Sequence, residues 1–146
     1  MAKVSIYLNF PGTTEEAFNF YKSVFGGEFG GEGMMRFGGM PPMEGQPPLS
    51  DELKNMVVHV ELPILNSFTI MGTDAPEEMG FTVEHGNNMH INLHPDNRTD
   101  TKRIFDRLSE GGKVTMELQE MFWGDYFGSC TDKYGINWMV ACASKE

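Results

Sequence analysis

Two polar side chains separated by one apolar residue give the first indication of chemistry in this chain. His59 and Glu61 alternate with apolar residues in the segment 58–62. Side chains two residues apart on a strand point to the same face, so an imidazole and a carboxylate would stand side by side. Such a pair could act as a general base with its orienting group. With His90 it could also form a two-histidine, one-carboxylate metal site.

A second kind of polar alternation begins near the start of the chain and returns 85 residues later. The first set is Ser5, Tyr7 and Asn9, and the second is His90, Asn92 and His94. Apolar residues lie between the members of each set, so each segment is expected to be a strand with one apolar and one polar face. His90 could be a metal ligand, a general base, or a hydrogen-bonded cleft residue without chemistry.

Both polar sets belong to an internal repeat. At the same offset of 85 residues, Phe20 meets Phe105 and the glycine pair 26–27 meets the pair 111–112. Each copy reads as an alternating strand, a polar turn, an amphipathic helix and a double glycine, which favours a left-handed helix exit. The repeat predicts two copies of one supersecondary unit.

The limits of the two helices follow from capping signals. Thr13 and Glu16 have the spacing of a capping box at the start of the first helix. Asn97 or Thr99 can cap the second helix.

Three further strands are predicted after each helix. They are 28–37, 55–62 and 67–72 in the first half, and 113–120, 125–131 and 136–143 in the second. The chain therefore reads as an α+β fold, in which two βαβββ modules form a curved mixed-sheet cup. We expect one domain, 1–146, because neither half could bury its helix and strands well alone. The modules cover approximately 1–83 and 87–146, and the Gly- and Pro-rich segment 38–50 is an exposed loop.

The apolar strand faces should pack on the helices, which leaves the polar faces to line the cup. In the last strand Trp138 and Val140 should face the helix and Met139 the cup. Concave faces of this kind commonly bind small ligands. Trp123 could stack on a ligand there or pack in the core. The candidate ligand-binding residues are Tyr7, His59, His90, Asn92, Trp123 and Met139, and the catalytic candidates are His90, His59 and Glu61.

Composition restricts the partners and the location. A net charge of −10 would repel the phosphate backbone of nucleic acids, so no nucleic-acid partner is expected. No apolar run approaches membrane-spanning length and no signal peptide is recognisable, so we expect no membrane association and a cytoplasmic location.

Cys130 and Cys142 are too few for a disulfide framework and should be buried free thiols on neighbouring strands.

With the strand order in view, the chain resembles the vicinal-oxygen-chelate superfamily, which includes glyoxalase I, bleomycin-resistance proteins, extradiol dioxygenases and fosfomycin-resistance enzymes. More narrowly, it looks like the PhnB-like subgroup. The resembling segments are FPG at 10–12, EEAFNFYK at 15–22, VFGG at 24–27, VHVEL at 58–62, IMGTD at 70–74, FWGDYFG at 122–128 and DKYG at 132–135, followed by Trp138. The resemblance implies a glyoxalase/bleomycin-resistance/dihydroxybiphenyl dioxygenase-like fold. It says less about activity, because this scaffold hosts many reactions.

The resemblance also implies where a metal would bind. Metal-dependent members of the superfamily take one ligand, usually His, Gln or Glu, from the opening and the closing strand of each module. Those positions fall here on Ser5, His90, Met139 and either Thr69 or Met71. Only His90 matches, and methionine is a poor substitute for a carboxylate at the usual divalent ions. We therefore expect no cofactor, and a divalent metal is disfavoured.

Three functions remain open from the sequence. The preferred hypothesis is metal-free binding of a small, partly apolar molecule in the cleft, which the bleomycin-resistance relatives show the scaffold to permit. Family resemblance also implies a homodimer. The first alternative is a divalent-metal-dependent lyase, isomerase or dioxygenase with atypical ligands. The second is a metal-free acid/base enzyme that uses His90 or His59.

Overall fold

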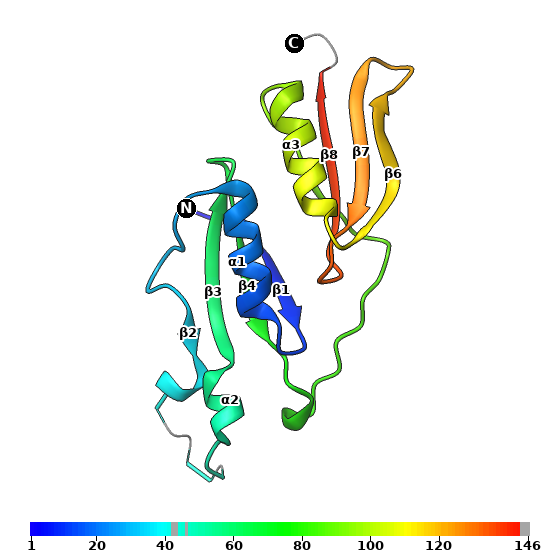
Figure 1. The fold of residues 1–146 in the computed structure, drawn as a ribbon. Helices are drawn as coiled ribbons and strands as arrows, with labels where there is room; N and C mark the ends of the chain where they lie inside the picture. Colours follow the sequence, from blue (N-terminus) through cyan, green and yellow to red (C-terminus); the bar gives the residue numbers. More distant parts are fainter. Residues whose placement is uncertain (42–43, 46, 144–146) are drawn as a thin grey trace. The chain divides into compact units, whose positions relative to one another are not determined.

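The computed structural model describes residues 1–41, 44–45 and 47–143, and it divides into two compact units, 1–83 (unit 1) and 84–146 (unit 2). Unit 1 contains β1 (Ile6–Phe10), α1 (Thr14–Phe25), β2 (Met35–Arg36), a 3-10 turn (Phe37–Gly39), α2 (Asp51–Asn55), β3 (Val57–Ile64), β4 (Phe68–Asp74) and a second 3-10 turn (Glu77–Met79). Unit 2 contains β5 (Ile91–Leu93), α3 (Arg98–Ser109), β6 (Lys113–Glu120), β7 (Asp125–Thr131) and β8 (Asn137–Ala143) (Figure 1).

Both units share one sheet topology. The strand order is β1-β4-β3-β2 in unit 1 and β5-β8-β7-β6 in unit 2. The opening strand of each unit runs parallel to the last strand, and the remaining neighbours are antiparallel. The α+β class and the repeat of mixed four-stranded modules predicted from the sequence are thus confirmed.

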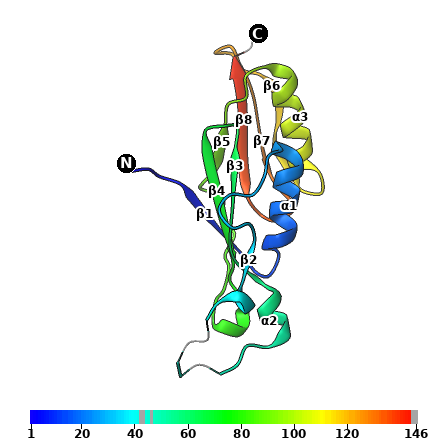
Figure 2. The same cartoon turned by 90° about the vertical axis from the view of Figure 1, so that its left-hand side faces the viewer.

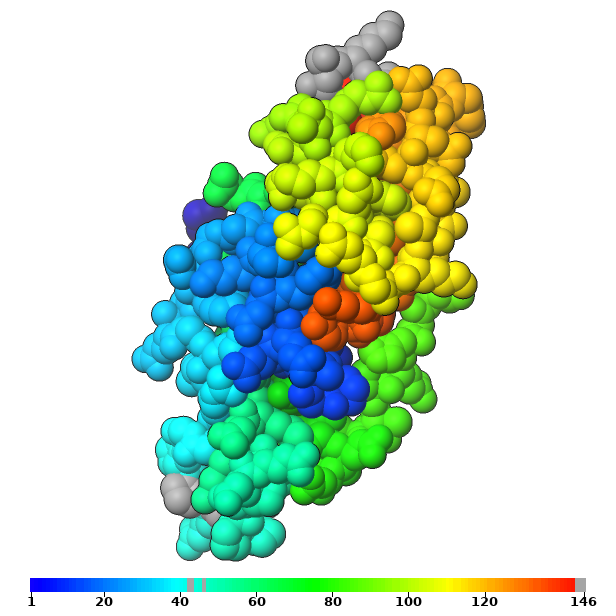
Figure 3. Space-filling model, viewed as in Figure 1, coloured from blue at the N-terminus to red at the C-terminus, as the bar shows by residue number. Residues whose placement is uncertain are grey.

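One helix covers one face of each sheet (Figure 2). In the space-filling view of Figure 3, the atoms of α1 are blue and those of α3 are yellow-green, each lying over the sheet of its own unit. The largest fully buried side chains include Phe10, Phe18, Tyr21, Leu62 and Ile70 in unit 1, and Ile104, Leu108, Trp138 and Val140 in unit 2. Burial of these apolar side chains is the main favourable term in folding. The helix-covered faces are therefore the cores. The opposite, open faces carry the side chains that could bind a ligand.

The predicted capping box at the start of α1 is wrong. The side chain of Thr13 makes no cap hydrogen bond. Instead one oxygen of Asp74, at the end of β4, accepts hydrogen bonds from the Thr14 backbone N–H at 3.0 Å and from Thr14 Oγ1 at 2.6 Å. Its other oxygen accepts from the Val57 N–H at 2.8 Å. A buried carboxylate from a distant strand has replaced the local cap and ties the helix start to the sheet.

The remaining capping signals are local. Asn97, one of the two predicted caps of α3, accepts a hydrogen bond from the Asp100 N–H at 2.8 Å. The short helix α2 was not predicted, and Ser50 caps it by accepting from the Leu53 N–H at 3.2 Å. This helix delays the next strand, so β3 begins at Val57 rather than at residue 55.

The predicted strand 28–37 shrinks to the two residues of β2. Gly31 and Gly33 have φ values of +57° and +78°, in the left-handed region that interrupts a strand. The predicted loop 38–50 also begins later than expected, because Gly38 and Gly39 belong to the 3-10 turn, and residues 42, 43 and 46 lie outside the described residues. The strands β6 and β7 have the predicted bounds.

The two cysteines have the surroundings that the sequence predicted. Cys130 on β7 and Cys142 on β8 are buried free thiols on neighbouring strands, as predicted. Burial raises the pKa of the Cys130 thiol. Within the described ranges, no helix is both long enough and apolar enough to span a membrane.

Candidate functional site

A row of three side chains crosses the open face of unit 1. The pairing register places Tyr7 of β1 opposite Met71 of β4, and Met71 opposite Glu61 of β3. The next residues along the strands, Leu8 and Leu62, are buried under the helix. Since successive side chains alternate between faces, the row lies on the face that the helix leaves open.

A hydrogen-bonded chain of three side chains spans this row. Tyr7 Oη lies 2.9 Å from His59 Nδ1, and His59 Nε2 lies 3.3 Å from Glu61 Oε2. The tyrosine and imidazole rings are 5.7 Å apart at their centroids and tilted by 48°. The side chains of His59 and Glu61 are 31% and 29% exposed. The sequence predicted that His59 and Glu61 share a face, but only the strand order brings Tyr7 to the other side of the imidazole.

Hydrogen-bonding capacity determines how protons are arranged along this chain. An ionised carboxylate can only accept hydrogen bonds, so a neutral His59 carries its proton on Nε2 and donates it to Glu61. The Nδ1 lone pair then accepts the hydroxyl hydrogen of Tyr7. Burial raises the pKa of Tyr7, which keeps the phenol protonated at neutral pH.

Two glycines make room for the carboxylate of Glu61. The Gly30 N–H donates a hydrogen bond to the backbone oxygen of Glu61 at 2.9 Å. A Cβ added at Gly30 would lie 2.8 Å from Glu61 Oε1, and one at Gly31 would lie 3.4 Å from the same atom. The sequence predicted a strand for the segment that contains Gly30 and Gly31. In the structure this segment is a loop that packs against the side chain of Glu61.

The open face of unit 2 has the same backbone but different side chains. Asn92 of β5 lies opposite Met139 of β8, and Met139 lies opposite Ser129 of β7. The Asn92 amide lies 3.2 Å from the ring of His94. His90 is partly buried just before β5, and within the described residues no hydrogen bond or ion pair involves its ring.

Comparison of the two units resolves which residue occupies the closing position in unit 1. Met71 pairs with Tyr7 as Met139 pairs with Asn92, and Tyr7 and Asn92 are equivalent in the repeat. Met71, rather than Thr69, therefore stands where Met139 stands in unit 2. Ser5, at the opening position, is a hydrogen-bond donor to the Met71 sulfur at 3.9 Å.

The donor set does not fit the metal that the resemblance implied. Methionine occupies both closing positions and serine one opening position, which leaves His90 as one suitable ligand of four. His59 offers no free nitrogen, because both ring nitrogens face hydrogen-bond partners. Among the residues that the structure describes, no cluster of three His, Cys, Asp or Glu side chains has the arrangement to hold a metal ion.

Trp123 lies apart from the other candidate residues of unit 2. It is in the turn between β6 and β7, 54% exposed, and its indole N–H donates to Asp125 at 3.1 Å. Asp125 pairs with Ala143, four residues along β8 from Met139. At about 3.3 Å per strand residue, that is roughly 13 Å. Trp123 packs edge-on against Phe122 instead of joining the row around Met139.

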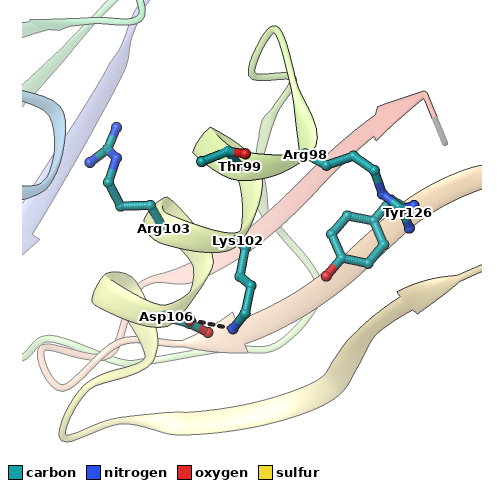
Figure 4. A pocket seen from close by; sticks show the side chains of 6 residues that line it. All are labelled: Arg98, Thr99, Lys102, Arg103, Asp106 and Tyr126. Atoms are coloured by element: carbon teal, nitrogen blue, oxygen red, sulfur yellow. Dashed lines mark hydrogen bonds and ion pairs between the residues drawn. The ribbon is translucent and has the colours of Figure 1, made fainter. Parts of the chain in front are cut away.

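An open surface pocket of about 450 Å³ lies beside α3 in unit 2, where the sequence predicted no site (Figure 4). Arg98 stacks over the Tyr126 ring at 4.0 Å, and Lys102 pairs with Asp106 at 2.7 Å. Figure 4 shows Arg98, Lys102 and Arg103 pointing in different directions. The exposed ion pair contributes little energy. Because the three cationic side chains point apart, they do not form one binding site for a common ligand. The lining residues are Arg98, Thr99, Lys102, Arg103, Asp106 and Tyr126.

The fold and the open faces define a class of protein. Two βαβββ units, each with one helix on one face of a four-stranded mixed sheet and a polar open face, are the glyoxalase type of architecture. The chain matches the Glyoxalase/Bleomycin resistance protein/Dioxygenase superfamily over residues 7–140 and belongs to it.

Individual relatives place the chain in the PhnB-like subgroup. It is 30% identical to protein YjdN of Escherichia coli K12, over 98% of this chain and 97% of YjdN. The structure of protein PA1353 from Pseudomonas aeruginosa is similar with a TM-score of 0.80 and 33% identity, covering 98% of each chain. A PhnB protein from Bacillus cereus, for which a 3-demethylubiquinone-9 3-methyltransferase activity has been suggested, has a TM-score of 0.73 and 26% identity, covering 97% of this chain and all of its own.

Proposed function

We propose that this protein binds a small, partly apolar molecule on the open face of unit 1, without a divalent metal. The observation that carries the proposal is the hydrogen-bonded chain Tyr7–His59–Glu61 across that face. It is a set of polar side chains with defined geometry on a sheet, and all three are partly exposed to solvent. Ligand sites characteristically combine a few placed polar groups with a larger apolar surface.

Two methionines supply the apolar part of the proposed site. Met71 lies between Tyr7 and Glu61 in the row across the sheet. Met35 of β2 pairs with His59 and is 40% exposed. Thioether side chains are flexible and polarisable, so they adapt to the shape of an apolar ligand.

The metal-free part of the proposal is supported by the donor chemistry. A divalent ion would need about three suitable ligands, and the family positions provide one. Recruiting His59 would break its hydrogen bond to Tyr7 or to Glu61.

A neutral fluorescent probe tests the location of the site. N-phenyl-1-naphthylamine becomes brighter in apolar surroundings, and we expect it to bind the wild-type protein. Met71→Ser and Met35→Ser should each weaken binding up to about tenfold, because part of a methionine side chain is lost from the contact surface. Met79→Ser is the matched control, since Met79 is an exposed methionine of the same unit outside the sheet. Equal weakening by all three substitutions would contradict the assignment of the site.

Elemental analysis tests the absence of metal. The purified protein would be exposed to Zn²⁺, Ni²⁺, Mn²⁺ and Fe²⁺, then dialysed and measured. We expect substoichiometric metal in each case. Stoichiometric metal that is lost in His90→Ala would overturn the metal-free proposal and favour the divalent-metal enzyme.

A metal-free acid/base enzyme is the second candidate, and the same hydrogen-bonded chain favours it. A hydroxyl, an imidazole and a carboxylate in series form the arrangement that moves a proton in hydrolytic triads. Turnover of a molecule recovered from the protein, abolished by His59→Ala, would decide for the enzyme.

A further inference from the structure

We infer that the ligand of unit 1 presents a hydrogen-bond donor, a hydroxyl or an N–H group, to the phenol oxygen of Tyr7. This inference rests on the proposed function, and it names the chemical class of the ligand. It follows from the direction in which the hydrogen bonds of the site must run.

The direction is set at the acidic end of the chain. Ionised Glu61 accepts only, so the hydrogen between it and His59 belongs to His59 Nε2. A neutral imidazole carries a hydrogen on one of its two nitrogens, and therefore His59 Nδ1 is an acceptor. The hydrogen between Nδ1 and Tyr7 Oη, 2.9 Å apart, must come from the phenol.

The phenol oxygen of Tyr7 is the end of the hydrogen-bonded series that is open to a ligand. Its only hydrogen is committed to His59, so toward a ligand it can offer only lone pairs. Tyr7 is 47% exposed, which makes this oxygen reachable. A ligand hydroxyl or N–H would complete the chain, whereas a carbonyl or ether oxygen would bring lone pairs against lone pairs.

The residues around Tyr7, His59 and Glu61 do not reverse the direction of these hydrogen bonds. Within the described residues, the side chains that hydrogen-bond with His59 are Tyr7 from β1 and Glu61 on its own strand. The residue that pairs with it from β2 is Met35, and the residue between Tyr7 and Glu61 on β4 is Met71. Both are uncharged and would face the apolar body of the ligand.

Indole and benzofuran are matched probes for this inference. They have nearly the same shape, but only indole has an N–H donor. Binding would be followed by shifts of backbone amide signals in NMR titrations at pH 8, above the range in which histidines ordinarily titrate. We expect indole to bind about tenfold more tightly than benzofuran, which corresponds to one net hydrogen bond.

Two variants separate the hydrogen bond from the apolar contact. In Tyr7→Phe both probes should bind with equal affinity, because the acceptor is lost and the ring remains. In His59→Ala the Tyr7 hydroxyl is free to rotate, so the indole preference should fall while binding persists. Tyr126→Phe is the control, since Tyr126 is a tyrosine of unit 2 that lies beside α3, and it should leave the preference unchanged.

The outcomes distinguish this inference from the function on which it rests. Equal affinity of the two probes for the wild-type protein, with shifts centred on β1, β3 and β4, would overturn the donor requirement and leave the binding function standing. A preference for indole that survives Tyr7→Phe would also overturn it. Failure of both probes to shift any signal of unit 1 would overturn both proposals.

Discussion

The open faces of the two units have one backbone plan and two different chemistries. At matched positions, unit 1 carries Tyr7, Met71, Glu61 and His59, and unit 2 carries Asn92, Met139, Ser129 and Phe127. At these described positions, unit 1 therefore has a hydrogen-bonded series of titratable side chains, and unit 2 has none. In unit 2 the hydroxyl of Ser129 lies 2.7 Å from that of Thr115 on the edge strand. The comparison shows that a repeated backbone preserves positions, whereas the side chains at those positions decide which unit can do polar chemistry.

The helix-covered faces differ in a complementary way. In unit 1, Gly72 of β4 lies beneath the ring of Phe18 and pairs with Val60 of β3. In unit 2 the glycine and the valine have exchanged strands, because Gly128 of β7 pairs with Val140 of β8. A Cβ at Gly128 would lie 2.8 Å from the ring of Phe105. Each unit thus needs one glycine to seat the aromatic ring of its helix, and either strand can supply it.

The largest expected effect comes from the buried carboxylate of unit 1. Asp74→Ala removes the acceptor for the Thr14 N–H, the Thr14 hydroxyl and the Val57 N–H, which are buried. We expect the free energy of unfolding to fall by about 3 kcal/mol, because unsatisfied buried polar groups are costly. Urea unfolding followed by far-UV circular dichroism measures it.

The same experiment can separate the two units. The two tryptophans of the chain, Trp123 and Trp138, are both in unit 2, so tryptophan fluorescence follows the unfolding of that unit directly. Asp106→Ala, which breaks an exposed ion pair with Lys102, is the control and should leave the urea midpoint nearly unchanged. A loss below about 1 kcal/mol in Asp74→Ala would show that the carboxylate does not hold the helix start.

The next effect tests the exchanged glycines. Gly72→Ala and Gly128→Ala should each lower the free energy of unfolding by about 1–3 kcal/mol, because the added methyl group would overpack the core. Phe18→Leu should recover part of the loss in Gly72→Ala but none of the loss in Gly128→Ala. Double-mutant cycles in urea measure the coupling. Equal recovery in both backgrounds would show that the glycines do not serve separate rings.

The smallest effect concerns an exposed pair at the edge of unit 1. Arg36 donates two hydrogen bonds to Glu15, at 3.0 and 2.9 Å, which lowers the pKa of that carboxyl. A lowered pKa contributes stability above the unfolded value of about 4.3, and the contribution is lost as the pH falls through the folded value. Because both side chains are substantially exposed, we expect Glu15→Gln to cost less than about 1 kcal/mol at pH 7.

A pH series checks this sign. The stability difference between wild type and Glu15→Gln should shrink toward zero as the pH is lowered below the ordinary pKa of glutamate. Glu78→Gln is the control in unit 1, an exposed glutamate for which no ion pair occurs within the described residues. A difference that grows on acidification would contradict the assignment.

Much of the fold could be predicted because it follows from local periodicity. Alternation alone placed His59 and Glu61 on the same face of their strand, and it placed Met139 and Trp138 on different faces of theirs. The repeat predicted that the two units share one topology. Alternation could not show that β1 pairs with β4, which brings Tyr7 within reach of His59. Trp123 was also out of reach of such reasoning, since a turn residue has no periodicity to give its direction.

The sequence by itself determined the module plan and the faces of the strands, because each depends on residue identity and a short period. The resemblance to the family added that Ser5 and Met139 stand where metal-dependent members carry ligands. Only the tertiary structure decided that Asp74 replaces the Thr13 cap, that Met71 occupies the closing position, and that Tyr7, His59 and Glu61 form one chain. These contacts join strands far apart in sequence. Their partners are selected by sheet order and register, which no local pattern encodes.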